Sequence, residues 1–265
     1  MVSAFEETPA SRWFRVIRAC PAPRLRLVCF PHAGGTANFF RTWARLMPDD
    51  AELLAVRYPG RADRLLEPPA REMAELSGPI ADACADLSGA PLVFFGHSMG
   101  ACVAFEVAAR LRARPGGHGP GALSVSGRAG PGGTRSERLA DTSDEKLIAE
   151  LTAMSATTAE VLADRELREL VLPAVRADYR LIEDYAASAP TRFLDIPVLA
   201  YYGDQDDQVD EESVKTWSGV TGAGFTARSF PGGHHYLEQQ AAALVGDLFD
   251  RLADLRPGGD PAPRG

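Results

Sequence analysis

The stretch that most restricts the fold runs from residue 91 to residue 111. A short apolar run over 91–95 predicts a buried strand, which leads into Gly-His-Ser-Met-Gly at 96–100, a G-x-S-x-G pattern. The residues that follow, 101–111, have the composition and apolar period of a helix. A serine on so sharp a strand-to-helix turn needs small neighbours, and glycines provide them. We therefore predict that Ser98 is a nucleophile, raised above the sheet beside the first amides of a helix.

Strand and helix patterns alternate along most of the chain, which indicates an α/β fold with a mostly parallel central sheet flanked by helices. The strands end at turn residues such as proline and glycine, and the helices have apolar stripes. Strands are expected over 13–18, 25–30, 51–58, 91–95, 122–126, 197–203 and 225–230, and helices over 38–47, 71–87, 101–111 and 244–255. The Pro/Gly-rich tail, 256–265, is expected to be disordered.

The composition fits one domain over residues 1–265, because 45% hydrophobic and 24% charged residues are ordinary proportions for a chain that buries a sizeable core. A net charge of −8 leaves no basic footprint for nucleic acid or for an anionic membrane surface. No apolar run is long enough to span a membrane, and the N-terminus lacks the layout of a signal peptide. We expect a cytoplasmic protein with no nucleic-acid or membrane partner.

The cysteines, Cys20, Cys29, Cys84 and Cys102, lack the spacing of a metal site. Three of them stand in apolar strand or helix patterns, so we expect reduced and mostly buried thiols. The sequence predicts no metal site.

The strand expected over 25–30 runs into Pro-His-Ala-Gly-Gly at 31–35. This loop resembles the one that supplies an oxyanion-hole amide in esterases, because glycines let its backbone approach a substrate closely. The candidate donors are the N–H of Ala33 and the N–H of Met99, which directly follows the nucleophile. His32 is expected to pack in the loop rather than to act as the base, since the base of such a fold stands late in the chain.

Two late loops carry a candidate acid and a candidate base. The strand over 197–203 runs into an aspartate-rich loop at 204–209, and the strand over 225–230 runs into Pro-Gly-Gly-His-His at 231–235. Open α/β sheets keep their sites at such strand ends, and the order Ser, Asp, His is that of the α/β-hydrolases. The histidine would take the proton of Ser98 and return it to the leaving group, while the acid fixes the histidine tautomer.

Residues 141–185 interrupt the alternation with helical patterns and no strand. Thr142 and Glu145 have the spacing of a capping box, and Pro173 should kink or restart a later helix. A helical insertion between two core strands of a hydrolase sheet is a natural lid. An ordinary pair of crossover helices is the alternative, because sequence position alone does not show what a segment covers.

A set of motifs spread over 25–255 resembles the type II thioesterases, which are stand-alone α/β-hydrolases that accompany polyketide and nonribosomal peptide synthases. The motifs are Phe-Pro-His-Ala-Gly-Gly at 30–35, Tyr-Pro-Gly-Arg at 58–61, Gly-His-Ser-Met-Gly at 96–100, Gly-Asp-Gln-Asp at 203–206 and Gly-Gly-His at 232–234. The set is specific, because general esterases share the serine pattern but not Tyr-Pro-Gly-Arg.

The resemblance implies hydrolysis of acyl groups from the phosphopantetheine arm of carrier proteins, which clears stalled or wrong acyl units. It assigns the base to His234 and the acid to Asp206, so the expected triad is Ser98, His234 and Asp206, with oxyanion donors at Ala33 and Met99. These assignments follow the Gly-Gly-His and Gly-x-x-Asp spacing of the family motifs.

Two departures from the family pattern concern neighbours of this triad. His235 stands where the family usually has an aromatic residue, and further aspartates flank Asp206. His235 is therefore the alternative base.

The expected reaction runs through an acyl-enzyme at Ser98 and needs no cofactor, because the substrate itself carries the phosphopantetheine. Acyl or peptidyl carrier protein domains are the expected partners, and we expect a monomer. Arg57, Arg61 and Arg64 are candidate docking residues, since a net charge of −8 would otherwise repel an acidic carrier. Two alternatives stay open: a small-molecule carboxylesterase of the same fold, and a non-catalytic module that binds carrier proteins.

Overall fold

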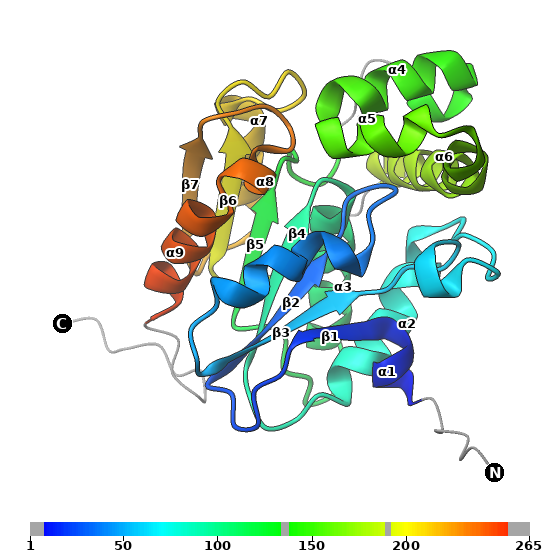
Figure 1. Ribbon diagram of the computed structural model, residues 1–265. Coiled ribbons are helices and arrows are strands. Elements are labelled where there is room, and N and C mark those ends of the chain that lie inside the picture. Colours follow the sequence, from blue (N-terminus) through cyan, green and yellow to red (C-terminus); the bar gives the residue numbers. More distant parts are fainter. Residues whose placement is uncertain (1–7, 134–137, 189–191, 254–265) are drawn as a thin grey trace, which may run out of the picture.

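The computed structural model describes residues 8–133, 138–188 and 192–253. Within them, seven strands form one sheet in the order β1-β3-β2-β4-β5-β6-β7 (Figure 1). The outer pair β1 and β3 is antiparallel and all other neighbours are parallel, which confirms the expected mostly parallel sheet. The strands are β1 (Phe14–Arg18), β2 (Leu25–Phe30), β3 (Ala51–Val56), β4 (Leu92–His97), β5 (Ala122–Ser126), β6 (Val198–Gly203) and β7 (Phe225–Phe230).

Helices cover both faces of the sheet (Figure 1). The long ones in these two layers are α2 (Met73–Ala85), α3 (Met99–Arg112) and α9 (Ala241–Leu252), beside the 3-10 helix η1 (Ala37–Arg45). Successive strand residues point to opposite faces. Val28 of β2 accordingly packs with α2 and α3, whereas Leu27 and Cys29 pack with η1 and α9. The shorter helices are α1 (Pro9–Trp13), η2 (Ala62–Arg64), η3 (Leu139–Asp141), α7 (Glu211–Lys215), η4 (Thr216–Val220) and α8 (Tyr236–Gln239).

The central strand β4 has every residue buried. A parallel strand with helices on both faces has no solvent side, which explains the uninterrupted apolar run that the sequence shows there. Its carboxyl end lies beside the carboxyl ends of β5 and β2, because these strands are parallel neighbours in the sheet. This edge is where open α/β sheets form their sites.

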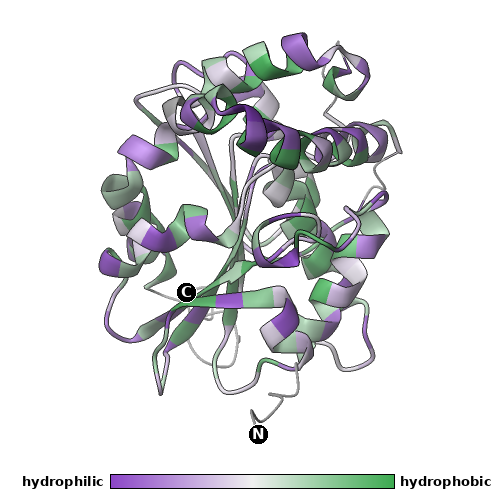
Figure 2. Ribbon diagram, turned by 45° about the vertical axis from the view of Figure 1, so that its right-hand side comes forward, coloured by the Kyte–Doolittle hydropathy of each residue, from purple (hydrophilic) through white to green (hydrophobic). Residues whose placement is uncertain are grey.

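Three helices between β5 and β6 lie over this carboxyl edge (Figure 1). They are α4 (Asp144–Met154), α5 (Ala156–Ala163) and α6 (Arg165–Ser188). Figure 2 shows hydrophobic and hydrophilic residues alternating along them, as amphipathic helices require. Their apolar sides share a cluster of buried residues with Leu139 of η3, made up of Leu147, Leu151, Leu162, Leu172 and Val175. The insertion expected over 141–185 is therefore helical.

Pro173 does not restart a helix, because α6 runs without interruption through that residue. The helices restart instead at Ser155, whose side chain accepts from Thr158 N–H, and at Asp164, whose side chain accepts from Leu167 N–H. Pro173 is exposed, so the carbonyl that loses its helical partner faces water.

The capping box expected from Thr142 and Glu145 does not form, and the N-cap lies one residue later. Ser143 is the N-cap of α4 and accepts from Lys146 N–H, whereas the Thr142 hydroxyl donates to Leu139 O at 2.8 Å. Trp13, expected in the first strand, ends α1 instead. The tail expected to be disordered, 256–265, lies outside the described residues.

The cysteines behave as the sequence predicts. All four are free, and three are buried: Cys29, Cys84 and Cys102. Every helix of the described ranges is too short or too polar to cross a membrane.

Candidate active site

Ser98 stands at the turn between β4 and α3, with backbone angles φ 53° and ψ −117°. A left-handed φ is strained for a residue with a side chain, and such strain concentrates at functional turns. The turn closes only because glycines flank it: a Cβ on Gly96 would stand 2.3 Å from Gly100 O, and one on Gly100 would stand 2.1 Å from Phe30 O. Ser98 N–H donates to Ser126 O at 2.8 Å, which ties the turn to β5. The strand, turn and helix predicted from the sequence are thus present.

His234 and Asp206 meet beyond the carboxyl ends of β7 and β6. His234 Nδ1 lies 2.8 Å from Asp206 Oδ2. The Asp206 side chain is 0% exposed, and its other oxygen accepts from Gln208 N–H at 2.9 Å. A carboxylate on Nδ1 fixes the imidazole so that Nε2 can exchange a proton with a nucleophile. His234 and Ser98 line the same cavity, so the three residues of the expected triad gather at one place.

The aspartates beside Asp206 have other surroundings. Asp204 Oδ1 accepts from Gly232 N–H at 3.0 Å and so braces the loop before His234. Asp207 is exposed to solvent. The geometry therefore selects Asp206 from this acidic loop.

His235, the alternative base, packs among rings instead of meeting the acid. Its ring centroid lies 4.6 Å from that of His32 and 6.2 Å from that of Phe39. Its Nδ1 lies 3.4 Å from Glu238 Oε1. Burial lowers the pKa of His235 and lowers the pKa of His32 well below its usual value. His32 is therefore a neutral packed residue of its loop, as predicted.

The two candidate oxyanion donors lie on either side of Ser98. Ala33 and Met99 line one cavity together with Ser98. Met99 is the first residue of α3, so its N–H has no acceptor inside the helix. The next two amides of the other loop are engaged, since Gly34 N–H donates to Asp178 Oδ2 at 2.7 Å and Gly35 N–H donates to His32 O at 2.9 Å. In the described ranges no protein group accepts from Ala33 N–H, so this donor is available.

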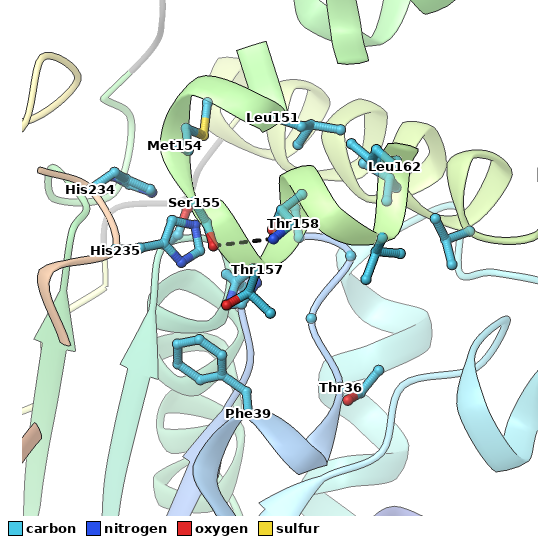
Figure 3. Close-up of a pocket in the computed structure, with 18 of the residues that line it drawn as sticks. Thr36, Phe39, Leu151, Met154, Ser155, Thr157, Thr158, Leu162, His234 and His235 are labelled. Atoms are coloured by element: carbon cyan, nitrogen blue, oxygen red, sulfur yellow. Dashed lines mark hydrogen bonds between the residues drawn. The ribbon is translucent and has the colours of Figure 1, made fainter. Parts of the chain in front are cut away.

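A cavity of about 390 Å³ lies between Ser98 and the helical insertion. Figure 3 shows Leu151, Met154 and Leu162 on the insertion side, with Phe39 across from them. The apolar residues that the insertion supplies are Leu151, Met154, Val161, Leu162, Val171 and Val175. Such a chamber suits an acyl chain whose carbonyl lies at Ser98.

Two further cavities reach Ser98 from other directions. One, of about 430 Å³, lies under the glycine-rich loop over 127–133 and also touches His234. The other, of about 220 Å³, lies between α6 and the two oxyanion candidates. A thioester carbonyl at Ser98 therefore has room for an acyl chain on one side and for a leaving group on another.

Two of the three arginines predicted to dock carrier proteins are buried. Arg61 and Arg64 are only 6% and 5% exposed. Arg61 is paired with Asp178, and Arg64 donates to both carboxylate oxygens of Glu67. The docking prediction was therefore wrong for these two, which are structurally paired residues of the loop. Arg57 forms an ion pair with Asp63 at 2.7 Å but is partly exposed, and its docking role stays a prediction.

Asp178 is the residue of this region that sequence reasoning missed. It stands on α6 in a stripe of buried residues with helical spacing, Ala174, Val175, Asp178, Leu181, Ile182 and Tyr185. A single acid inside an apolar stripe is a sequence signal, because a buried carboxylate needs a partner.

The comparisons with known proteins agree with this geometry. A family model described as Thioesterase domain matches residues 25–252. The probable cadicidin biosynthesis thioesterase of Streptomyces griseus is 40% identical over 243 residues, which cover 92% of this chain and 66% of that protein. Thioesterase PikA5 of Streptomyces venezuelae is 38% identical over 245 residues, which cover 92% of this chain and 86% of that protein.

The comparison with solved structures agrees with the family match. The type II thioesterase BorB from the borrelidin biosynthetic cluster matches with a TM-score of 0.82 and 38% identity, covering 91% of this chain and 97% of that chain. YbtT, a type II thioesterase from the yersiniabactin pathway, matches with a TM-score of 0.81 and 30% identity, covering 90% and 97%. The chain belongs to the thioesterase family, as a type II thioesterase of the kind that accompanies polyketide and nonribosomal peptide synthases, and it is a hydrolase of thioesters.

Proposed function

We propose that Ser98, His234 and Asp206 form the catalytic triad of this hydrolase. Ser98 Oγ attacks the thioester carbonyl carbon while His234 Nε2 takes its proton, and the oxyanion accepts from the N–H groups of Ala33 and Met99. The carbon–sulfur bond then breaks, and the thiolate takes up the proton from His234. Water, deprotonated by the same histidine, releases the acid and restores Ser98. The observation that carries the proposal is the 2.8 Å contact between His234 and Asp206 beside the serine turn.

The arrangement suits a thioester in particular. A thiolate leaves easily, so the step that needs most help is formation of the oxyanion, and one oxyanion donor contributes roughly 3–4 kcal/mol. Asp206 holds His234 in the required tautomer and stabilises the imidazolium that forms. The proposed chemistry uses no metal and no cofactor of the protein's own.

We further propose that the substrate is an acyl group on the phosphopantetheine arm of a carrier protein domain, and that hydrolysis clears stalled or wrong acyl units. Relatives named for biosynthetic pathways support this, among them the gramicidin S biosynthesis protein GrsT of Aneurinibacillus migulanus, 31% identical over 245 residues. The apolar chamber beside Ser98 supports an acyl substituent. A monomeric state and a cytoplasmic location stay predictions.

The test combines a variant with a choice of substrates. Ser98→Ala should fold normally and lose about 10⁶-fold in kcat, and the wild-type enzyme should show a burst of thiol release and an acyl adduct on Ser98. Carrier-bound acyl groups should be hydrolysed with a higher kcat/KM than free acyl esters. The opposite preference would indicate a carboxylesterase, and near-normal turnover by Ser98→Ala would exclude the serine mechanism. Binding of carriers without any burst would indicate a non-catalytic module.

A further inference from the structure

A buried ion pair joins the Tyr-Pro-Gly-Arg loop to the helical insertion. The guanidinium of Arg61 donates through both terminal nitrogens to both carboxylate oxygens of Asp178, with 2.7 Å between Nη2 and Oδ1. The Arg61 and Asp178 side chains are 7% and 2% exposed. Burying two charges is costly unless their hydrogen bonds are satisfied, so a pair at this position needs an explanation beyond stability.

The same carboxylate also holds the oxyanion loop. Asp178 Oδ2 accepts from Gly34 N–H at 2.7 Å, and Gly34 directly follows the candidate donor Ala33. The helix that carries Asp178 lies against this amide, because a Cβ on Gly34, whose φ is 75°, would stand 2.7 Å from Val175 Cγ2. The orientation of the peptide next to Ala33 is therefore fixed by α6.

The other end of the oxyanion loop is held by the residue that begins the Tyr-Pro-Gly-Arg motif. Tyr58 is buried, and its hydroxyl donates to Pro31 O at 3.3 Å. The Arg61 guanidinium lies 5.4 Å from the centre of the Tyr58 ring. The motif thus contacts the loop over 31–35 directly through Tyr58 and indirectly through Arg61 and Asp178.

We propose that Asp178 and Arg61 are positioning residues for the oxyanion hole. Asp178 fixes the Gly34 peptide through a charge-assisted hydrogen bond, and this orients Ala33 N–H toward the developing oxyanion. Arg61 supplies the compensating charge, because an uncompensated carboxylate near the site would oppose negative charge on the substrate oxygen. The inference rests on the proposed role of Ala33 and assigns the Tyr-Pro-Gly-Arg motif to the chemistry rather than to docking.

A purely structural tie between α6 and the core is the competing explanation. Tyr185, also on α6, provides a matched control, since its hydroxyl donates to Glu106 Oε1 of α3 at 3.0 Å. This buried hydrogen bond anchors the same helix but does not touch the loop over 31–35. Tyr185→Phe therefore measures the effect of weakening α6 alone.

The experiment compares Asp178→Ala, Asp178→Asn and Tyr185→Phe on an acyl-pantetheine thioester. Asp178→Ala should lower kcat by about 10²-fold, the scale of a lost oxyanion donor, with KM changed less than about threefold. Asp178→Asn should recover most of the loss, because its amide oxygen can still accept from Gly34 N–H. Tyr185→Phe should leave kcat unchanged although it lowers the urea midpoint. If Asp178→Ala does not fold, Asp178→Ser replaces it, because the serine side chain is too short to reach Gly34 N–H.

A second measurement separates positioning from stability. An alkyl boronic acid that forms a tetrahedral adduct on the serine should bind Asp178→Ala (or Asp178→Ser) more weakly by about the same factor as the fall in kcat. An acyl-pantetheine amide, which stays planar, should bind all variants equally. Unchanged boronate affinity, or an equal loss of kcat in Tyr185→Phe, would overturn the inference. Acyl adducts on Ser98 in the wild type, together with loss of turnover in His234→Ala, would show that the proposed triad still stands in that case.

Discussion

His234 and His235 end the same loop but meet different partners, and this difference predicts different consequences of substitution. His234→Ala should lower kcat by about 10⁶-fold, because it removes the imidazole that Asp206 holds and that we propose as the base. His235→Phe should stay within about threefold of the wild type, since the ring packs against His32 and Phe39. Thiol release under saturating substrate measures both. A ranking in the opposite order would move the base to His235.

The acid can be tested in the same way within its loop. Asp206→Asn should lower kcat by about 10⁴-fold, because an amide facing His234 Nδ1 permits the wrong tautomer. Asp207→Asn, one residue away and exposed, is the matched control and should have little effect. Equal losses in both variants would mean that the loop, rather than one carboxylate, is what the reaction requires.

The sequence predicted the contiguous part of the site better than the dispersed part. Ser98 and Met99 could be predicted because one turn imposes glycine, serine and glycine within five consecutive positions. The pair of Arg61 and Asp178 could not, because Asp178 stands in none of the motifs and its partner lies 117 residues away in the chain. An arginine in a polar loop is normally predicted to be exposed. Only the position of α6 shows that Arg61 is buried against the Asp178 carboxylate.

The tight turn between β4 and α3 makes a prediction about stability. Gly100→Ala should lower the free energy of unfolding by at least about 3 kcal/mol, because the added methyl meets a backbone oxygen that cannot move aside. Gly246→Ala is the control, since that exposed position in α9 has no heavy atom within 4 Å of a Cβ and should gain up to about 1 kcal/mol. Urea unfolding measures both. A tolerant Gly100→Ala would mean that the turn can open.

The insertion helices make a prediction about acyl chain length. Met154→Trp fills part of the chamber, and excluding two methylenes costs about 1.6 kcal/mol, or about 15-fold in kcat/KM. Long acyl thioesters should lose this factor while acetyl thioesters change less than about twofold. Leu167→Trp is the control, because Leu167 is 45% exposed and lies outside the chamber lining. A profile unmoved by Met154→Trp would make these helices ordinary crossovers.

The bounds of some strands could be predicted, whereas those of the helices were shifted by a few residues: the C-terminal helix expected over 244–255 is α9, Ala241–Leu252. β5 and β7 begin and end where the sequence indicates, because turn residues bound each strand. Helix α6 passes through Pro173 since that side of the helix faces solvent, a fact that depends on where the helix lies. The segment expected to be an α-helix over 38–47 is the 3-10 helix η1.

Two buried histidines near the site should make the free energy of unfolding depend on pH. His32 and His97 come from two strand ends, and burial lowers the pKa of both well below the usual value. Both therefore stay neutral in the folded state at pH values where the unfolded chain, with a histidine pKa of about 6.5, takes up protons. The contribution of these two histidines to the free energy of unfolding should be constant above about pH 7 and should fall as the pH drops below 6.5, by up to about 1.4 kcal/mol per pH unit for each histidine.

Urea midpoints between pH 5.5 and pH 7.5 measure this dependence. His97→Gln should flatten the slope, because a glutamine does not titrate and its amide can pair with the Ser126 hydroxyl that His97 contacts at 3.0 Å. His118→Gln is the control, since that histidine is exposed and should leave the slope as it is. An unchanged slope in His97→Gln would mean that the ring can take up a proton inside the fold.

The strained backbone angle at Ser98 lowers the stability of the folded protein at the position that carries the proposed nucleophile. Glycine adopts a φ of 53° without the steric cost that serine carries there, which is about 1–3 kcal/mol. A mutant library screened only for survival of heating should therefore enrich Ser98→Gly, which lacks the proposed nucleophile and should not turn over thioesters. Directed evolution of this enzyme for industrial temperatures needs a turnover assay in each round, because thermal selection on its own favours a residue that cannot carry the proposed reaction.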